Sequence, residues 1–189
     1  MRGYDALVTV DEAIEIVDHD LKWPAQFGGE RDRVRIGLGL HHMRYEHIGS
    51  TAVPGLAGKG VVDLMVLYPP GMLERARAAL DALGFQRQST RDPFPESRPM
   101  RIGAMRFDGK TFRLHAHVIA SDDEEAATLR GFRDRLRADP KLRDAYVERK
   151  RAILASGITD TIDYAYAKSE FIQSTLDSIS ESLSGRPPG

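Results

Sequence analysis

The feature that most constrains the fold is a nearly continuous apolar run from Val61 to Leu67, interrupted only by Asp63. A run of this kind is typical of a strand that is buried on both faces. The chain has 189 residues, 41% of them hydrophobic, which is enough for one globular core. We therefore expect a central sheet with helices packed on it.

Signals for further strands occur on both sides of this run. Asp108-Gly109 separates two β-like stretches and is a strong short-range signal for a hairpin. The other predicted strands are residues 13–17, 45–48, 102–107 and 111–119. Residues 88–100 hold three prolines and several polar residues, which indicates a long mobile loop.

Helices are predicted mainly in the last third of the chain. Ser121 and Glu124 form a capping box, and Asp139 followed by Pro140 caps and opens the next helix. The predicted helices are residues 24–39, 73–83, 121–138, 140–157 and 161–183. Strands followed by helices predict an α+β fold, in which a mixed β-sheet is covered by helices and joined to a helical C-terminal part.

The sequence shows no repeat and no low-complexity linker, so we expect a single domain at residues 13–183. Its sheet core would occupy residues 13–120 and its C-terminal helices residues 121–183. Residues 1–12 are interpreted as an N-terminal extension and residues 184–189 as a flexible tail.

Composition excludes several classes of partner and site. A net charge of -1 gives no electrostatic reason to expect a nucleic-acid partner. Disulfides and thiolate metal sites are excluded because the chain has no cysteine. No apolar stretch approaches the roughly 20 residues that span a bilayer, and the N-terminus lacks a signal core, so we expect no membrane contact and a cytoplasmic protein. The oligomeric state stays open.

The segment with the most chemical content runs from the second strand into the central one. The strand enters the turn Gly49-Ser50-Thr51, a glycine-rich loop carrying Lys59 follows, and the central strand then presents Asp63. Glycine lets backbone N–H groups approach an anion, and the two hydroxyls and the ammonium add donors. A plain turn and a buried, hydrogen-bonded acid are the alternatives at these positions.

This segment resembles the hallmark of the GrpB family, a His-Ile-Gly-Ser-Thr-Ala-Val-Pro-Gly-Leu run that here spans His47 to Leu56, followed by Lys and then Asp. The resemblance covers about residues 13–178. The other matching positions are Trp23-Pro24 and Phe27, His115 to Val118, Phe132-Arg133-Asp134 and Leu136, Tyr146 and Lys150, and Tyr164, Lys168 and Phe171.

The resemblance implies membership of the nucleotidyltransferase superfamily and a relation to a domain fused to some dephospho-CoA kinases, for which a role in folding assistance has been proposed. It implies the fold and a pocket for a nucleotide or phosphorylated small molecule, and it does not fix a reaction. The chain departs from the family where Gly58 and Gly60 replace the usual Ala and Pro around Lys59, and where Ala116 replaces Leu. The first change makes the loop more flexible.

Active enzymes of this superfamily hold two metals with acids at i and i+2 of one strand. Here Asp63 is followed at i+2 by Met65, so the usual two-metal site cannot form from this strand alone. His115 and His117 share one strand face and could join Asp63 if the strands are neighbours. A divalent metal (Mg, Mn or Zn) is thus a candidate cofactor, and two His with one carboxylate suit Fe, Mn or Zn better than Mg.

Other roles remain open for the same side chains. The two histidines would alternatively supply a general base and a phosphate ligand, or form a structural pair. Four arginines lie on or near the loop and hairpin, namely Arg98, Arg101, Arg106 and Arg113. Of these, Arg101 and Arg113 are predicted to reach a phosphate, with a solvated sheet edge as the alternative. Lys168 is predicted to line the pocket from a helix, where ordinary surface packing is the alternative.

Three functions follow as hypotheses. The first is metal-dependent transfer of a nucleotidyl or phosphoryl group, with Asp63, His115 and His117 as catalytic and metal-binding residues. The predicted phosphate or nucleotide ligands are Gly49, Ser50, Thr51, Lys59, Arg101, Arg113 and Lys168. The second is non-catalytic ligand binding in the same pocket, and the third is an interaction or folding-assistance domain. Met65 counts against the first hypothesis.

Overall fold

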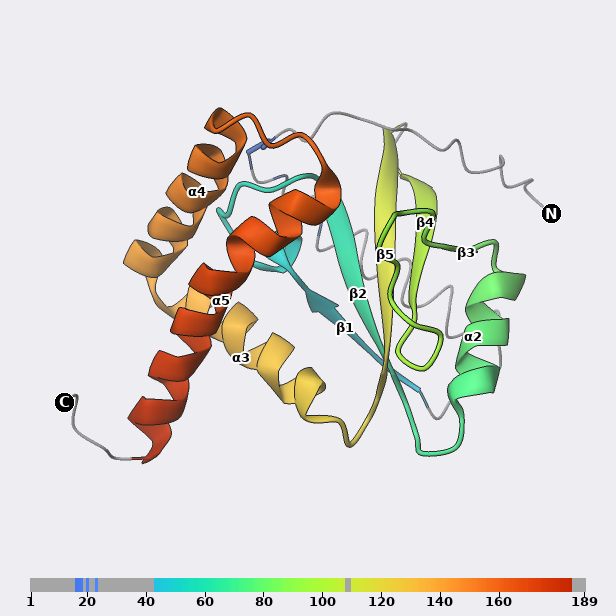
Figure 1. Ribbon diagram of the computed structural model, residues 1–189. Coiled ribbons are helices and arrows are strands. Elements are labelled where there is room, and N and C mark those ends of the chain that lie inside the picture. Colours follow the sequence, from blue (N-terminus) through green and yellow to red (C-terminus); the bar gives the residue numbers. More distant parts are fainter. Residues whose placement is uncertain (1–15, 19, 21–22, 24–42, 108–109, 185–189) are drawn as a thin grey trace.

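A five-stranded mixed sheet forms the centre of the molecule, with strand order β1-β2-β5-β4-β3 (Figure 1). The structure is a computed structural model that describes residues 16–18, 20, 23, 43–107 and 110–184. The strands are β1 Arg44–Ile48, β2 Val61–Tyr68, β3 Gln86–Arg87, β4 Met100–Phe107 and β5 Lys110–Ala120. The helices are α2 Leu73–Ala82, α3 Glu124–Ala138, α4 Pro140–Ala155 and α5 Thr161–Ser184, and a 3-10 turn, η1, covers Ser50–Ala52.

The two central strands, β2 and β5, run parallel, and every other pair in the sheet is antiparallel. The parallel register places Asp63 beside His115 and Met65 beside His117. Strands β4 and β5 pair as the predicted hairpin, whose turn at residues 108–109 lies outside the described residues. The predicted site required β2 and β5 to be neighbours in the sheet, and they are.

Strand β2 is buried on both faces, as its apolar run predicts. On one face, Val62, Leu64 and Val66 join a core cluster with Ala76 and Leu80 of α2. On the other, Met65 and Leu67 pack with Ile119 and with Ala126 of α3. Figure 1 shows α2 on one side of the sheet and α3 to α5 on the other. The mixed α+β fold predicted from the sequence is confirmed.

The loop between β1 and β2 packs into the helical layer. Val53 and Leu56 are fully buried, and they form a third core cluster with Leu136 of α3 and Tyr146 of α4. Phe171 of α5 packs against the same cluster. This loop, residues 49–60, is called the signature loop below, and it lies between the sheet and the C-terminal helices.

The described helices begin and end within about three residues of the predicted bounds, and one predicted cap differs. Asp139 caps α4 as predicted, because its Oδ1 accepts hydrogen bonds from the N–H groups of Lys141 (3.0 Å) and Leu142 (3.1 Å). The cap of α3 is Asp123, whose carboxylate accepts from the N–H of Glu125 at 2.8 Å. The predicted Ser121 capping box is wrong, because the helix begins later and an aspartate is in position.

Loop 88–99, predicted to be mobile, is tied to the helical layer. Arg91 forms an ion pair with Asp163 of α5, and the Tyr166 hydroxyl donates to Asp92 at 2.5 Å. Arg98 pairs with Glu125 of α3. These polar contacts bridge the loop to α3 and α5.

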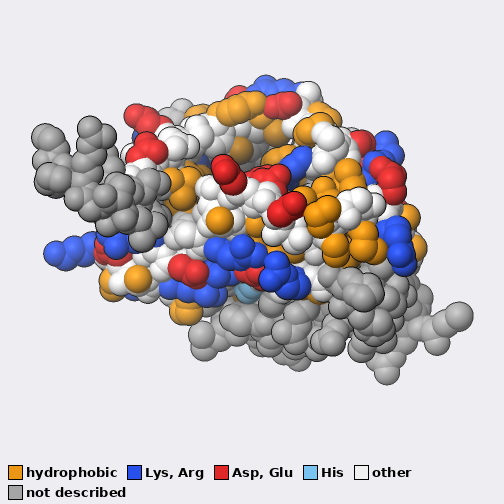
Figure 2. Space-filling view, turned by 90° about the horizontal axis from the view of Figure 1, so that it is seen from below, with side chains coloured by type: hydrophobic (Ala, Val, Ile, Leu, Met, Phe, Trp, Pro, Cys, Tyr) orange, Lys and Arg blue, Asp and Glu red, His pale blue; other side chains and the backbone are white. Residues whose placement is uncertain are grey.

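Several predictions fall on residues that the structure does not describe. They concern the extension at 1–12, most of the strand at 13–17, all of the helix at 24–39, and most of the tail at 184–189. Val17 is described, and it forms an isolated antiparallel bridge with Gly58. No helix in the described part of the chain is long and apolar enough to cross a membrane. On the face shown in Figure 2, basic and acidic side chains are interleaved with hydrophobic ones.

Candidate functional site

Asp63, His115 and His117 form a cluster on the sheet face that α3 to α5 cover. Asp63 Oδ1 lies 3.5 Å from His115 Nδ1 and 3.5 Å from His117 Nε2. One ligand atom from each residue lies within 4.8 Å of the other two. The parallel register and the two-residue period of a strand produce this arrangement. The acid and both imidazoles share one face, as the sequence predicted.

Asp63 and His117 have the charge states that metal ligands need. Burial acts to raise the pKa of the Asp63 carboxyl, but hydrogen bonds from His115 and His117 outweigh it and hold that pKa well below its ordinary value. Burial lowers the pKa of His117. At neutral pH the cluster therefore holds a carboxylate beside a neutral imidazole at His117.

The donor set and its spacing fit a divalent transition metal. Zinc bonds of about 2.0–2.1 Å at tetrahedral angles leave neighbouring ligand atoms about 3.4 Å apart, close to the 3.5 Å separations from Asp63. All three side chains are only partly buried. Three protein ligands would leave a coordination position open, as in catalytic sites.

Position 49 requires glycine because its backbone lies very close to the carboxylate of Asp63. Its backbone has φ 69° and ψ -171°, a combination that is essentially restricted to glycine. A Cβ atom at this position would lie 2.1 Å from Asp63 Oδ2. The turn glycine therefore makes room for the protein's own carboxylate, and its predicted contact with a ligand phosphate stays a prediction.

Three lysines gather on two tyrosine rings beside this cluster. The ammonium groups of Lys59 and Lys168 lie 5.1 Å and 4.5 Å from the centre of the Tyr164 ring. That of Lys150 lies 4.7 Å from the centre of the Tyr146 ring. Lysines from the loop, α4 and α5 thus meet at one place, in contact with aromatic faces that favour cations.

The charges of these lysines are only partly compensated within the described residues, where the carboxylate of Asp63 acts on Lys59 and Lys168. Burial lowers the pKa of Lys150 to about 7 and that of Lys168 to about 8, and burial also lowers the pKa of Lys59. None of the three forms a carboxylate ion pair among the residues that the structure describes. Lys150 donates to the carbonyl of Ala57 and lies 3.4 Å from Ser50 Oγ. A bound anion would offset the cost of burying these cations.

Two predicted phosphate ligands lie elsewhere. Thr51 is buried, and its hydroxyl forms a hydrogen bond of 2.9 Å with His47 Nε2. Arg101 pairs with Ala116 in the sheet register, so its side chain is on the face opposite His115 and His117.

The role predicted for Arg101 is therefore wrong. Its guanidinium is buried, and it forms ion pairs with Asp81 of α2 at 2.7 Å and Glu96 at 2.9 Å. The alternation of side chains along a strand decides this. Met100 is the β4 partner of His117, and only residues an even number of positions from Met100 share the face of His117. Arg101 is one position away. Arg113 does lie on the site face, two residues before His115, and its charge acts on Lys59.

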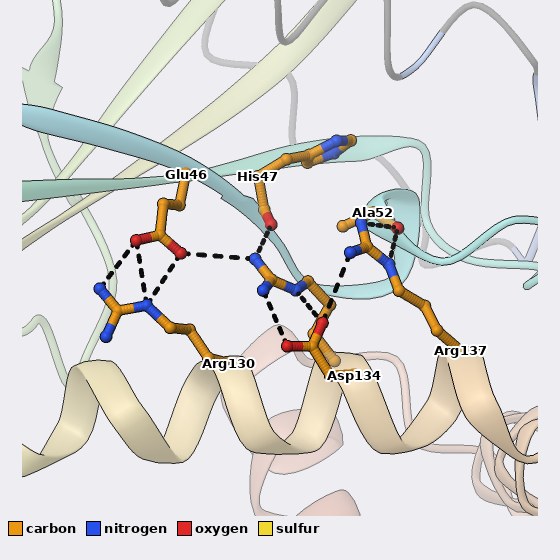
Figure 3. A network of polar contacts seen from close by, with 7 residues as sticks. Glu46, His47, Ala52, Arg130, Asp134 and Arg137 are labelled. Carbon is orange, nitrogen blue, oxygen red and sulfur yellow. Dashed lines mark hydrogen bonds and ion pairs between the residues drawn. The ribbon is translucent and has the colours of Figure 1, made fainter.

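Arginines on one face of helix α3 contact the end of β1 and the start of the signature loop (Figure 3). Arg130 forms a two-pronged ion pair with Glu46, with contacts of 2.7 to 3.0 Å. Arg133 donates to the carbonyl of His47 at 3.0 Å. Arg137 donates twice to the carbonyl of Ala52, at 2.9 Å and 2.7 Å.

Helix α4 continues the same pattern along the loop. Arg143 donates to the carbonyl of Pro54 at 3.3 Å, and Lys150 donates to that of Ala57. Cations from two helices therefore fix the carbonyl groups of the loop, and the position of the Ser50 turn follows from these contacts.

Lys150 is the functional candidate that sequence reasoning missed, since the sequence analysis named it only among the positions of the family resemblance and not among the phosphate ligands. A signal was present, because Tyr146, Lys150 and Ile153 share one helix face and all three are buried. Arg98 and Phe94 were also missed as neighbours of the site: Phe94 meets the His117 ring edge-to-face at 5.9 Å.

The chain belongs to the GrpB family, since the family model described as GrpB protein matches residues 13–178. A UPF0157 protein of Pseudomonas aeruginosa is 34% identical over 167 residues, which cover 88% of this chain and 67% of that protein. A dephospho-CoA kinase of Mycolicibacterium paratuberculosis is 27% identical over 74% of this chain and 39% of its own length. The predicted relation to a kinase-fused domain is thus confirmed.

A solved structure supports the same fold. Conserved protein GrpB from Enterococcus faecalis matches with a TM-score of 0.68 and 23% identity, covering 89% of this chain and 99% of that chain. A structure of the Cid1 poly(U) polymerase matches with a TM-score of 0.48 and 17% identity over 70% of this chain and 42% of that chain. Only the first of these similarities supports the fold.

Proposed function

We propose that this chain binds a nucleotide or related phosphorylated small molecule together with a divalent metal, and that it transfers a nucleotidyl or phosphoryl group. The observation that carries the proposal is the position of the Asp63–His115–His117 cluster beside three lysines, of which Lys150 is buried and Lys59 and Lys168 are partly buried. A metal-ligand set on the sheet lies near a group of only partly compensated cations from the loop and the helices that cover this face. That combination suits a ligand that carries phosphate groups.

Each group has a distinct role in this proposal. Asp63, His115 and His117 would hold the metal, which when bound would act as a Lewis acid toward a phosphoryl oxygen. Lys59, Lys150 and Lys168 would bind the remaining phosphate oxygens and balance their charge. Ser50 lies beside Lys150 and would donate its hydroxyl to the same ligand, and Arg113 would contribute from the neighbouring strand position.

A second candidate function is binding without catalysis. Met65 occupies the position where a second metal-binding acid would be needed, and its side chain is fully buried in the α3-facing core. Two-metal phosphoryl transfer uses both ions to stabilise the attacking and the leaving oxygen. A binding module would keep the lysines and the metal cluster and show no turnover.

Thermal unfolding with pyrophosphate or ATP, each with and without Zn²⁺ or Mn²⁺, tests the proposal. A ligand at one hundred times its Kd stabilises the folded state by about 2.7 kcal/mol, which corresponds to a rise in Tm of about 5–10 °C for a chain of this size. We expect Asp63→Asn to lose the metal-dependent part and Lys168→Met the anion-dependent part. Asp144→Asn, an exposed acid on α4, is the control.

Turnover separates the two candidate functions. Release from ATP of pyrophosphate (nucleotidyl transfer) or of ADP (phosphoryl transfer) that depends on Asp63 supports transfer, whereas binding with release of neither product supports the non-catalytic module. If neither anion nor metal raises the Tm of the wild-type chain, both functions are excluded.

A further inference from the structure

Arg98, from the loop before β4, contacts the His117 ring on the side away from Asp63. Its Nη1 lies 3.3 Å from His117 Nδ1, while His117 Nε2 lies 3.5 Å from Asp63 Oδ1. The arginine is held from two further sides. Its Nε donates to Glu125 at 2.6 Å, and its guanidinium lies 4.5 Å from the centre of the Phe94 ring.

These neighbours favour one tautomer of His117. A guanidinium carries donors and no acceptor, so it forms a hydrogen bond with Nδ1 only when that atom has a free lone pair. The proton of the neutral ring is then on Nε2, where the carboxylate of Asp63 can accept it. Both contacts therefore stabilise the Nε2–H form.

Metal binding needs the other tautomer. A histidine that ligates a metal usually donates its second ring N–H to a carboxylate or a carbonyl. If His117 bound a metal through Nε2, its proton would move to Nδ1 and would face the N–H groups of Arg98. The contact with Arg98 and coordination by Nε2 are therefore mutually exclusive.

We propose that Arg98 is a positioning residue that holds His117 as its Nε2–H tautomer and thereby competes with a divalent metal for the Asp63–His115–His117 cluster. Metal binding would require Arg98 to leave the ring and remain paired with Glu125 alone, or to bind an anionic ligand. Because Arg98 belongs to the loop that is tied to α3 and α5, the position of that loop would set the metal affinity. Only the metal part rests on the proposed function.

The tautomer is measured directly in the wild-type chain by ¹⁵N NMR of labelled histidine at pH 8, with the His117 signals assigned by their loss in His117→Gln. We expect a protonated Nε2 and an unprotonated Nδ1. In Arg98→Met, which removes the donor and keeps an unbranched side chain, we expect both nitrogens to shift toward a mixture of tautomers. A protonated Nδ1 in the wild type, or no change in the variant, overturns the proposal.

Calorimetric titration with Zn²⁺ tests the competition. Changes in the groups that contact a metal-binding histidine typically alter affinity by 10–100-fold, so we expect Arg98→Met to bind Zn²⁺ about tenfold more tightly than the wild type. Arg91→Met is the matched control, since it removes an exposed arginine of the same loop that pairs with Asp163. Equal Zn²⁺ affinity in the wild type and Arg98→Met overturns the competition.

The NMR measurement and the Zn²⁺ titration test separate parts of the proposal, so one can fail while the other succeeds. If neither protein binds Zn²⁺, the metal site of the proposed function is wrong, and the competition falls with it, while the NMR experiment still decides whether Arg98 sets the tautomer. The wild-type tautomer is measured without Arg98→Met, so that result stands even if Arg98→Met does not fold.

Discussion

At the scale of single residues, the site depends on a glycine that no other residue can replace. Gly49 combines a left-handed φ with a side-chain position already occupied by Asp63. The conformational cost and the steric conflict are separate effects, and a second glycine in the chain allows them to be separated.

Gly49→Ala is expected to destabilise the fold by more than the strain of a left-handed residue, which is about 1–3 kcal/mol, because its Cβ would displace the Asp63 carboxylate. Gly71→Ala is the control, since Gly71 has φ 80° and a Cβ atom added there would meet no heavy atom within 4 Å. Urea unfolding of both variants gives the comparison. Equal losses of stability would show that Asp63 moves aside without cost.

Lys150 is expected to make stability depend on pH. Its pKa is about 7 in the folded chain and is lowered from an ordinary value of 10.5, so the unfolded chain binds more protons between these values. Stability contributed by this group therefore rises with pH from about 7 to about 10, by at most about 1.4 kcal/mol for each pH unit.

Urea unfolding at pH 7 and pH 9 checks this expectation. The difference in stability between the wild type and Lys150→Met should change in favour of the wild type as pH rises. Lys141→Met, an exposed lysine of the same helix, should show no such change. A pH-independent difference for Lys150→Met would mean that the buried ammonium keeps its ordinary pKa.

At the scale of secondary-structure elements, α3 and α4 act as a support for the signature loop. Their cationic side chains donate to the carbonyl groups of His47, Ala52, Pro54 and Ala57. The contacts join segments that are far apart in sequence, which explains why the loop motif and the C-terminal helices occur together in this fold.

Arg137→Ala is expected to cost about 1–3 kcal/mol, because it leaves the buried carbonyl of Ala52 without its donor. Arg135→Ala on the same helix removes only an exposed pair with Asp139 at 3.5 Å and should cost less than about 1 kcal/mol. Thermal unfolding of both variants measures the difference. Similar losses would contradict the support role of Arg137.

At the scale of the whole molecule, the candidate site lies between two layers, the sheet and the C-terminal helices. A ligand there would contact the turn at Ser50, the strand at Asp63 and the helices that carry Lys150 and Lys168. Helix α2 covers the opposite face of the sheet (Figure 1).

Pyrophosphate binding is therefore expected to slow amide hydrogen exchange in β2, α4 and α5 together and to leave α2 nearly unchanged. The physical reason is that a ligand stabilises the elements that it bridges, while distant units can still open locally. Exchange monitored by mass spectrometry, with and without ligand, checks this. Uniform protection that includes α2 would indicate a global effect on stability in place of a site between the layers.

Local sequence patterns determined many of the secondary-structure elements of this protein. The apolar run at β2, the Asp108-Gly109 hairpin signal and the Asp139 cap each depend on neighbours in sequence, so the elements could be predicted from the chain alone. The motif from His47 to Leu56 led to the family, and strand periodicity correctly placed His115 and His117 on one face.

Only the tertiary structure decided which cations face that cluster. Arg101 is on the opposite face and Lys150 enters the site, because these positions follow from strand register and helix docking across long sequence separations. The contact of Arg98 with His117 likewise depends on where the loop before β4 lies in the folded chain. Burial and pairing depend on residues that are far apart in the sequence and meet only in the folded chain. A local sequence pattern contains one partner of each contact and does not identify the other.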